Sequence, residues 1–77
     1  MSKNVQWYWN AAPDPFAVGK PQDWRPYSKE DNDKIEQHFS NKSNKAELKD
    51  HVIHFQERMQ VHKQDFNRQR PVKREEK

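Results

Sequence analysis

The chain contains no cysteine, and for a sequence of 77 residues this is the feature that most restricts how it can fold. A small domain without disulfides or zinc–thiolate sites must be held together by packing alone. Because a chain of this size buries only about 60% of the surface that it exposes when unfolded, it has room for one domain and no deep cleft between two. Hydrophobic residues make up only 30% of the chain, but 3 Trp, 2 Tyr and 4 Phe favour a small folded core with polar tails.

Several classes of function are disfavoured by what the sequence lacks. Gly19 is the only glycine, which excludes the glycine-rich loops that bind phosphate through closely approaching backbone. The serines fall in a tail, a helix start and a polar loop, so no nucleophile with a base and an orienting acid can be assigned, and we expect no enzymatic activity. There is no long apolar stretch and no secretory-signal layout, so we expect an intracellular protein, nuclear or cytoplasmic, without membrane contact.

The histidines raise the question of a metal site, since imidazole is a common zinc ligand. His51 and His54 lie in a segment with strand character, and their spacing points their side chains to opposite faces. No cysteine or well-placed carboxylate completes a tetrahedral set with His62. We therefore expect no metal and no cofactor, and we assign the histidines to solvent or to a pocket.

The net positive charge is concentrated near the carboxyl terminus. Residues 1–57 carry 8 basic and 9 acidic side chains, whereas residues 58–77 carry 7 basic and 3 acidic ones. A cluster of basic residues in this last part offers several donors to one anionic ligand: Arg68, Arg70, Lys73 and Arg74. A solvated terminal tail is the alternative interpretation of such a charged run.

Residue patterns predict a strand, a long loop and a sheet edge in the first third of the chain. Large apolar residues at positions 5, 7 and 9 have the period of two that is typical of a half-buried strand. Residues 10–21 contain three prolines and Gly19 without any period, which predicts an extended loop. Pro26 cannot donate a ladder hydrogen bond, so we expect residues 22–27 at an edge or a strand end.

A helix is predicted from Ser28 to about residues 40–44. Ser28 can cap it, three acidic residues lie in its first turns, and Ile35 and Phe39 form an apolar stripe that we expect to face the core. Further segments with strand character lie at residues 46–48, 51–56, 59–62 and 70–74. The predicted fold class is α+β, a single small domain with an antiparallel sheet packed on one amphipathic helix.

Aromatic side chains and clustered arginines together favour a nucleotide-like ligand. Trp7, Trp9, Trp24 and Tyr27 must partly form the core, but an aromatic ring can also stack on a purine. A stacked base beside the guanidinium of Arg70 fits a ligand that carries phosphates. Single-stranded RNA is an alternative, although residues 1–57 lack the extended basic surface that it would require.

A series of short motifs runs along nearly the entire chain: Trp7-Tyr8-Trp9, Trp24-Arg25-Pro26-Tyr27, Asn32, Ile35-Glu36, Phe39, Phe55, Gln60, and Arg68 to Arg74. Their order and spacing resemble the WWE domain family, which is named for two tryptophans and a glutamate, here Trp7, Trp24 and Glu36. The resemblance covers residues 5–74 and leaves residues 1–4 and 75–77 as expected flexible tails. It implies an antiparallel half-barrel sheet of about six strands, wrapped around one helix and open at a ligand pocket.

The resemblance also implies a function and a set of site residues. Members bind poly(ADP-ribose) at its internal iso-ADP-ribose unit, or terminal ADP-ribose or ATP, and occur in ubiquitin ligases and ADP-ribosyltransferases. Gln60 matches the residue that contacts adenine, Arg70 matches the one that binds phosphate, and Trp9 matches an aromatic pocket position. The implied protein is a monomeric, non-catalytic module that recognises poly(ADP-ribose) or ADP-ribosylated proteins and links ADP-ribosylation to ubiquitination.

Departures from the family pattern support a second hypothesis. Arg25 stands where a well-studied member has a tryptophan, His51 stands at a pocket tyrosine position, and the loop from Asn10 to Asp23 is longer. Despite these departures, we expect that His51 can stack or hydrogen-bond and that Arg25 can add a contact to phosphate. The alternative is a protein-interaction or scaffolding module with a degenerate pocket, in which the long loop contacts the partner.

Overall fold

The computed structural model describes residues 5–14, 16–17 and 19–76, so the tails expected at residues 1–4 and at residue 77 lie outside the described residues. Within this part the chain forms one helix and six strands. In chain order they are β1 (Val5–Asn10), β2 (Trp24–Pro26), α1 (Lys29–Ser40), β3 (Lys45–Glu47), β4 (His51–His54), β5 (Met59–His62) and β6 (Asp65–Glu76). The described part contains no helix that is long and apolar enough to cross a membrane.

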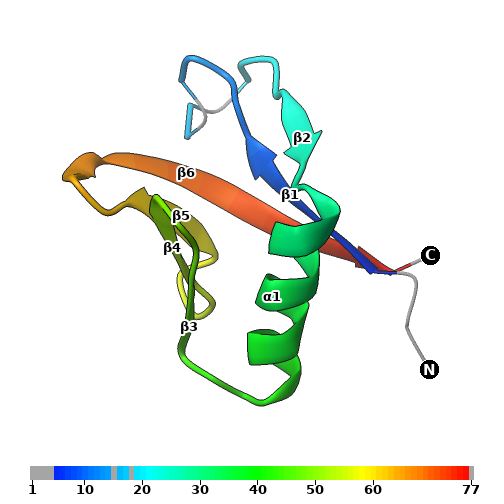
Figure 1. Cartoon of the computed structure of the whole chain (residues 1–77). Helices are drawn as coiled ribbons and strands as arrows, with labels where there is room; N and C mark the ends of the chain where they lie inside the picture. Colours follow the sequence, from blue (N-terminus) through cyan, green and yellow to red (C-terminus); the bar gives the residue numbers. More distant parts are fainter. Residues whose placement is uncertain (1–4, 15, 18, 77) are drawn as a thin grey trace.

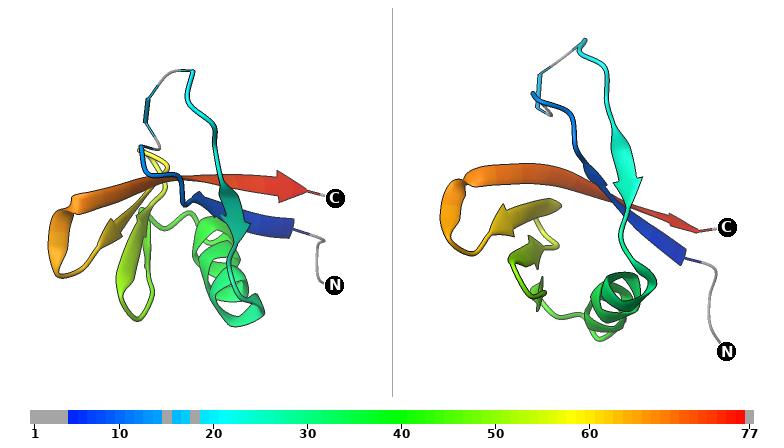
Figure 2. Two further views of the ribbon diagram at one scale, coloured as in Figure 1. Left: turned by 90° about the horizontal axis from the view of Figure 1, so that it is seen from above. Right: turned by 45° about the horizontal axis from the view of Figure 1, so that its top comes forward.

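The strands form one open antiparallel sheet in the order β2-β1-β6-β5-β4-β3. The long strand β6 joins the two halves, because its C-terminal part pairs with β1 and its N-terminal part pairs with β5 (Figure 1). Seen nearly along the helix axis, the sheet curls around α1 (Figure 2, right). The helix packs against β1 and β3, which lie toward opposite ends of the strand order. These features confirm the predicted α+β half-barrel around one helix.

The last strand is longer than the sequence predicted. β6 begins at Asp65 and ends at Glu76, whereas the expected strand covered residues 70–74 only. Its length follows from its two partners, because β5 pairs with it back to Asp65 and β1 pairs with it as far as Glu76. Glu75 and Glu76 therefore belong to the sheet, although they were expected in a tail. The short strand β2 lies at the edge of the sheet, as predicted from its proline.

The helix begins where its capping residue predicts. The Ser28 hydroxyl accepts a hydrogen bond of 3.3 Å from the backbone N–H of Asp31, and acidic residues in the first turn complement the helix dipole. Ile35 is fully buried, as the apolar stripe predicts. Phe39 differs from the expectation, because 41% of it is exposed and its ring packs edge-on against Trp7 with 5.2 Å between ring centroids. The apolar stripe of α1 thus begins in the core at Ile35 and ends at the partly exposed ring of Phe39.

The hydrophobic core fills the space between the curled sheet and α1. Its buried members come from the helix and from both halves of the sheet: Trp7, Tyr27, Ile35, Ala46, Leu48, Ile53 and Val72. Trp7 and Tyr27 are therefore core residues, whereas Trp9 is partly buried and packs against the core. Trp24 is half-buried on the edge strand β2.

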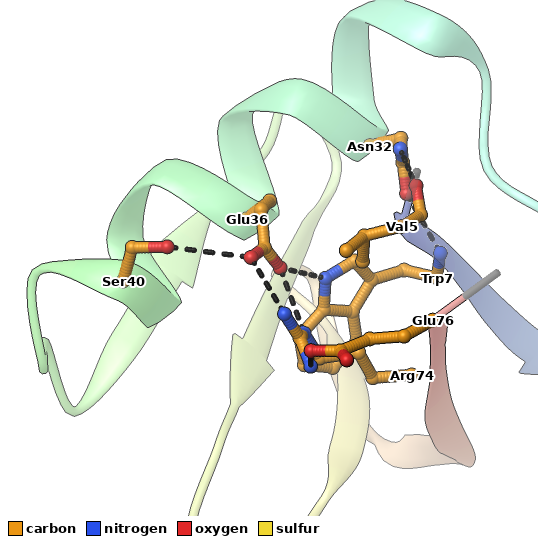
Figure 3. Close-up of polar contacts among 7 residues, drawn as sticks. All are labelled: Val5, Trp7, Asn32, Glu36, Ser40, Arg74 and Glu76. Carbon is orange, nitrogen blue, oxygen red and sulfur yellow. Dashed lines mark hydrogen bonds and ion pairs between the residues drawn. The ribbon is translucent and has the colours of Figure 1, made fainter. Parts of the chain in front are cut away.

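A polar cluster joins α1 to the sheet (Figure 3). Glu36 Oε1 accepts hydrogen bonds of 2.9 Å from Trp7 Nε1 and from Arg74 Nε, and Arg74 Nη2 donates to Glu36 Oε2, also at 2.9 Å. One turn earlier on the helix, Asn32 accepts from the backbone N–H of Trp7 at 2.7 Å and donates to the carbonyl of Val5 at 2.9 Å. These directional contacts fix α1 against β1 and β6, where apolar packing alone would allow the helix to slide.

Candidate ligand pocket

A cavity of about 510 Å³ opens at the end of the half-barrel near the first turn of α1. It is lined by Trp9, Ala11, Arg25, Tyr27, Asp31, Leu48, His51, Gln60, Arg68 and Arg70. Among these are all the residues that the sequence predicted for ligand binding, and they come from different strands: Trp9 on β1, Arg25 on β2, His51 on β4, Gln60 on β5 and Arg70 on β6. The fold therefore gathers distant parts of the chain around one space, while their binding role stays a prediction.

Gln60 is a buried polar residue of the cavity, and its orientation is fixed by Tyr27. The Tyr27 hydroxyl donates a hydrogen bond of 2.6 Å to Gln60 Oε1, and both residues are buried. Burial raises the pKa of the Tyr27 phenol above its usual range, so the hydroxyl keeps the proton that it donates. Because Oε1 is engaged, the side-chain amide N–H groups are the part of Gln60 left to recognise an acceptor on a ligand.

Arg70 is held by the backbone of the loop that follows β1. Its Nη1 donates to the carbonyl oxygens of Asn10 at 3.0 Å and Ala12 at 2.7 Å, and its guanidinium carbon lies 6.0 Å from the centroid of the Trp9 ring. The buried Asn10 side-chain oxygen in turn accepts from the backbone N–H groups of Ala12 at 3.0 Å and Asp23 at 3.2 Å. This anchoring orients the guanidinium beside Trp9, and its Nε and Nη2 are donors suited to a phosphate.

His51 lies on β4 directly opposite His62 on β5, with the rings edge-on and their centroids 5.0 Å apart. Burial, together with the positive charge that His62 can carry, holds the pKa of His51 below its ordinary value. The His51 imidazole is therefore neutral at pH 7 and can stack on a ring or make a neutral hydrogen bond. Within the described ranges, no three His, Asp or Glu side chains come together in a way that could hold a metal ion.

Arg25 lies at the solvent-exposed rim of the cavity. Its side chain is 61% exposed, and its Nε and Nη2 contact one carboxylate oxygen of Asp23 at 3.2 and 3.1 Å. An exposed ion pair of this kind contributes little to stability. Arg25 can therefore exchange Asp23 for a ligand phosphate at small cost.

The basic cluster that the sequence predicted is divided by the fold, so the prediction that its four members serve one ligand is wrong. Arg68 and Arg70 line the cavity, but Arg74 pairs with Glu36 in the polar cluster. Lys73 Nζ lies 4.8 Å from the centroid of the Trp24 ring, away from the cavity lining. Alternation along a strand places Lys73 on the face opposite to the arginines, and Arg74 lies about 13 Å beyond Arg70 at about 3.3 Å per residue.

Four lining residues were not assigned to the ligand site from the sequence: Ala11, Tyr27, Asp31 and Leu48. Tyr27 appeared in the sequence only as a core or stacking aromatic, and its role in orienting Gln60 depends on a contact between distant segments. Asp31 was assigned to the helix start, which is correct, but the same residue also borders the cavity. No local sequence pattern indicates that Asp31 borders the cavity, because this location depends on where the first turn of α1 packs against the sheet.

The half-barrel thus gathers stacking, amide and guanidinium groups in one end cavity of a small domain. The WWE domain family model matches residues 5–74, so the chain belongs to the WWE domain family, a family of protein-interaction and poly(ADP-ribose)-binding modules. No match was found among curated proteins. Two of the residues that give the family its name, Trp7 and Glu36, are hydrogen-bonded to each other in the polar cluster, while Trp24 on the edge strand donates from Nε1 to Gln22 at 2.8 Å.

Proposed function

We propose that this domain is a non-catalytic module that binds poly(ADP-ribose) at its iso-ADP-ribose unit, or a related ADP-ribose or adenine nucleotide. The observation that carries the proposal is the register of β5 and β6, in which Gln60 and Arg70 are direct partners. Side chains of such a pair have their Cβ atoms about 5 Å apart. An amide that suits a base and a guanidinium that suits a phosphate therefore share one wall of the cavity.

The adenine base is recognised by stacking and by hydrogen bonds. The partly buried Trp9 offers a ring face, and the amide N–H groups of Gln60 are directed to an acceptor because Tyr27 engages Oε1. The neutral His51 offers a second ring or a further hydrogen bond from the opposite half of the sheet. These groups supply selectivity for a base without the closely approaching glycine backbone that other nucleotide sites use.

The phosphates are neutralised by guanidinium groups. Arg70 is already oriented by loop carbonyls, so little conformational freedom is lost when it binds an anion. Arg68 and the rim residue Arg25 extend the positive lining, in which Asp31 is the acidic member. Each charge-assisted hydrogen bond to a guanidinium contributes about 1.5–3 kcal/mol, enough for a pair of phosphates to dominate the affinity.

A module with this specificity connects ADP-ribosylation to another activity of its parent protein. Family membership supports a parent of the ubiquitin-ligase or ADP-ribosyltransferase class, with ADP-ribosylated proteins as partners in the nucleus or cytoplasm. The domain contributes recognition as a monomer and leaves catalysis to other parts of the parent.

Titration calorimetry with iso-ADP-ribose, ADP-ribose and ATP tests the proposal. We expect at least one of them to bind with a dissociation constant below millimolar, and Arg70→Ala to weaken that binding by about tenfold or more. The control Arg58→Ala removes the same charge from an exposed turn outside the cavity and should leave the affinity unchanged. Failure of all three ligands to bind, or equal binding by Arg70→Ala and the parent, contradicts the proposal.

A protein-interaction module is the second candidate function, and exposed aromatic side chains favour it. Phe16 in the long loop is 54% exposed and Phe66 at the start of β6 is 78% exposed, so each offers a large apolar group that a protein partner can cover. This function predicts that capture of a protein partner depends on the loop from Asn10 to Asp23 and is insensitive to Arg70→Ala. A shortened loop that leaves capture intact argues against it.

A further inference from the structure

A second hollow adjoins the ligand cavity along β6. It has a volume of about 360 Å³ and is lined by Pro13, Phe16, Asn67, Arg68, Gln69 and Arg70. Arg68 and Arg70 line both this hollow, which we term the loop groove, and the ligand cavity. The two spaces therefore adjoin each other, with Arg68 and Arg70 at their shared border.

The loop groove exists because β6 extends beyond the end of β1. β6 pairs with β1 from Val72 to Glu76, whereas from Asp65 to Pro71 it pairs, among the described strands, with β5 alone. The described part of the long loop rises from the end of β1 on the side of β6 that β1 leaves (Figure 1). Pro13 and Phe16 of this loop thus line one side of the groove, and β6 residues line the other.

Hydrogen bonds fix the two ends of the long loop, so the part of the groove wall next to β1 has a defined position. The backbone N–H of Ala11 donates to the carbonyl of Asp23 at 2.7 Å, and the Asn10 side chain binds backbone N–H groups at both ends of the loop. Ala12 is only 3% exposed and its carbonyl accepts the hydrogen bond from Arg70. The groove is consequently built on the same contacts that orient Arg70 in the ligand cavity.

The loop groove repeats the chemistry of the ligand cavity. Phe16 presents a large aromatic ring that is 54% exposed, and Arg68 adds a guanidinium on the face that it shares with Arg70. Gln69 also borders the groove, but its side chain lies on the face of β6 opposite to the arginines and donates from Nε2 to the carbonyl of Phe66 at 2.8 Å. An aromatic face and a pair of cations are the groups that a second nucleotide unit requires.

We propose that the loop groove is a second subsite, which binds the neighbouring unit of an ADP-ribose chain whose first unit occupies the ligand cavity. The proposal rests on the proposed function and makes its ligand more specific: the domain prefers an oligomer of ADP-ribose to a single unit. Arg68 and Arg70 bridge the phosphates of successive units, and Phe16 stacks on a ring of the second unit. The gain from one stacked ring corresponds to about tenfold or more in affinity.

Calorimetry with ligands of two lengths tests the second subsite. The parent domain is titrated with iso-ADP-ribose and with a defined dimer of ADP-ribose, so that the statistical advantage of the longer ligand is at most about twofold. We expect the dimer to bind about tenfold more tightly. Phe16→Ala should abolish this length preference and leave iso-ADP-ribose binding unchanged, while Arg68→Ala should weaken the dimer more than the single unit. Phe16 is exposed, so its removal should leave the melting temperature unchanged.

Phe66→Ala is the matched control, because Phe66 is equally large, more exposed and outside the loop groove. Equal affinities of the parent for both lengths, or an equal loss for both in Phe16→Ala, overturn the second subsite while the proposed function stands. Failure of the parent to bind either length overturns the proposed function itself. An oligoadenylate RNA that binds as tightly as the dimer and loses affinity in Phe16→Ala would assign the groove to single-stranded nucleic acid and overturn the proposal.

Discussion

Arg74 on β6 and Glu36 on α1 form a two-point ion pair, with both nitrogen–oxygen contacts at 2.9 Å. The side chains of the two residues are 20% and 19% exposed, so the pair is partly shielded from solvent. The same carboxylate accepts the indole N–H of Trp7, which makes Glu36 the point where the helix, the first strand and the last strand meet. This contact bears on the stability of the domain. The cavity beside the first turn of α1 bears on ligand binding.

Glu36→Gln should destabilise the domain by about 2 kcal/mol, because it replaces charge-assisted hydrogen bonds to Arg74 with neutral ones. Urea unfolding followed by tryptophan fluorescence measures the loss. Glu57→Gln is the matched control, since Glu57 is exposed in the turn between β4 and β5 and should change little. Equal losses in the two variants would show that the ion pair does not stabilise the fold.

Protonation of Glu36 should lower the stability of the domain in acid. Hydrogen bonds from Arg74 hold the pKa of Glu36 below its ordinary value. Because the folded-state pKa is lower than the unfolded one, the contribution is complete above the ordinary glutamate pKa of about 4.3 and is lost as the pH falls through the folded value. Urea midpoints measured from neutral pH into this range should fall more steeply for the parent than for Glu36→Gln. Parallel pH profiles would contradict this assignment.

Tyr27→Phe should weaken iso-ADP-ribose binding by about tenfold and cost about 1–3 kcal/mol of stability. The substitution leaves the buried Oε1 of Gln60 without its donor and removes the contact that directs the amide N–H groups to the ligand. Calorimetry and urea unfolding report the two effects separately. Tyr8→Phe serves as the control, because Tyr8 lies on the face of β1 opposite to Trp9 and the cavity. Unchanged affinity in Tyr27→Phe would mean that Gln60 needs no positioning.

Asn10→Ala should weaken binding of phosphate-containing ligands and spare adenosine. Asn10 closes the loop whose carbonyls hold Arg70, so its loss releases the guanidinium and leaves the base-binding groups in place. We expect the combination of Asn10→Ala with Arg70→Ala to bind scarcely more weakly than Arg70→Ala alone, because both act through one group.

Asn44→Ala is the control for this experiment, since Asn44 is exposed and lies outside the cavity lining. Calorimetry with iso-ADP-ribose and adenosine separates the two ligand classes. If Asn10→Ala weakens both ligands to the same extent, the loop supports the whole cavity and does not act through Arg70.

Local features of the sequence predicted the elements but misjudged how far they extend. Ser28 marked the helix start because a capping hydroxyl acts within one turn. The stripe of Ile35 and Phe39 indicated the inner side of the helix, but burial of Phe39 depends on how far the sheet reaches along α1, and the ring remains 41% exposed. The extent of β6 could not be predicted, because its outer residues other than Phe66 are polar and are held by backbone pairing with β1 and β5.

The sequence by itself determined which groups are available and which of them share a face. A capped amphipathic helix, strands with alternating residues, and a resemblance that singled out Gln60 and Arg70 were all visible in the chain. The sequence also places Arg70 and Arg74 on one side of β6, since side chains two or four positions apart on a strand point the same way. The sequence does not determine which group each of these two arginines contacts.

Tertiary structure alone decided the partners. α1 packs against β1, the neighbour of β6, and brings Glu36 to Arg74, while the long loop brings its carbonyl oxygens to Arg70. Two arginines with the same local environment thus have different roles, one structural and one directed to the ligand cavity. The physical reason is that a side chain's orientation is a local property of the strand, whereas its partner depends on the docking of a helix and a loop from distant parts of the chain.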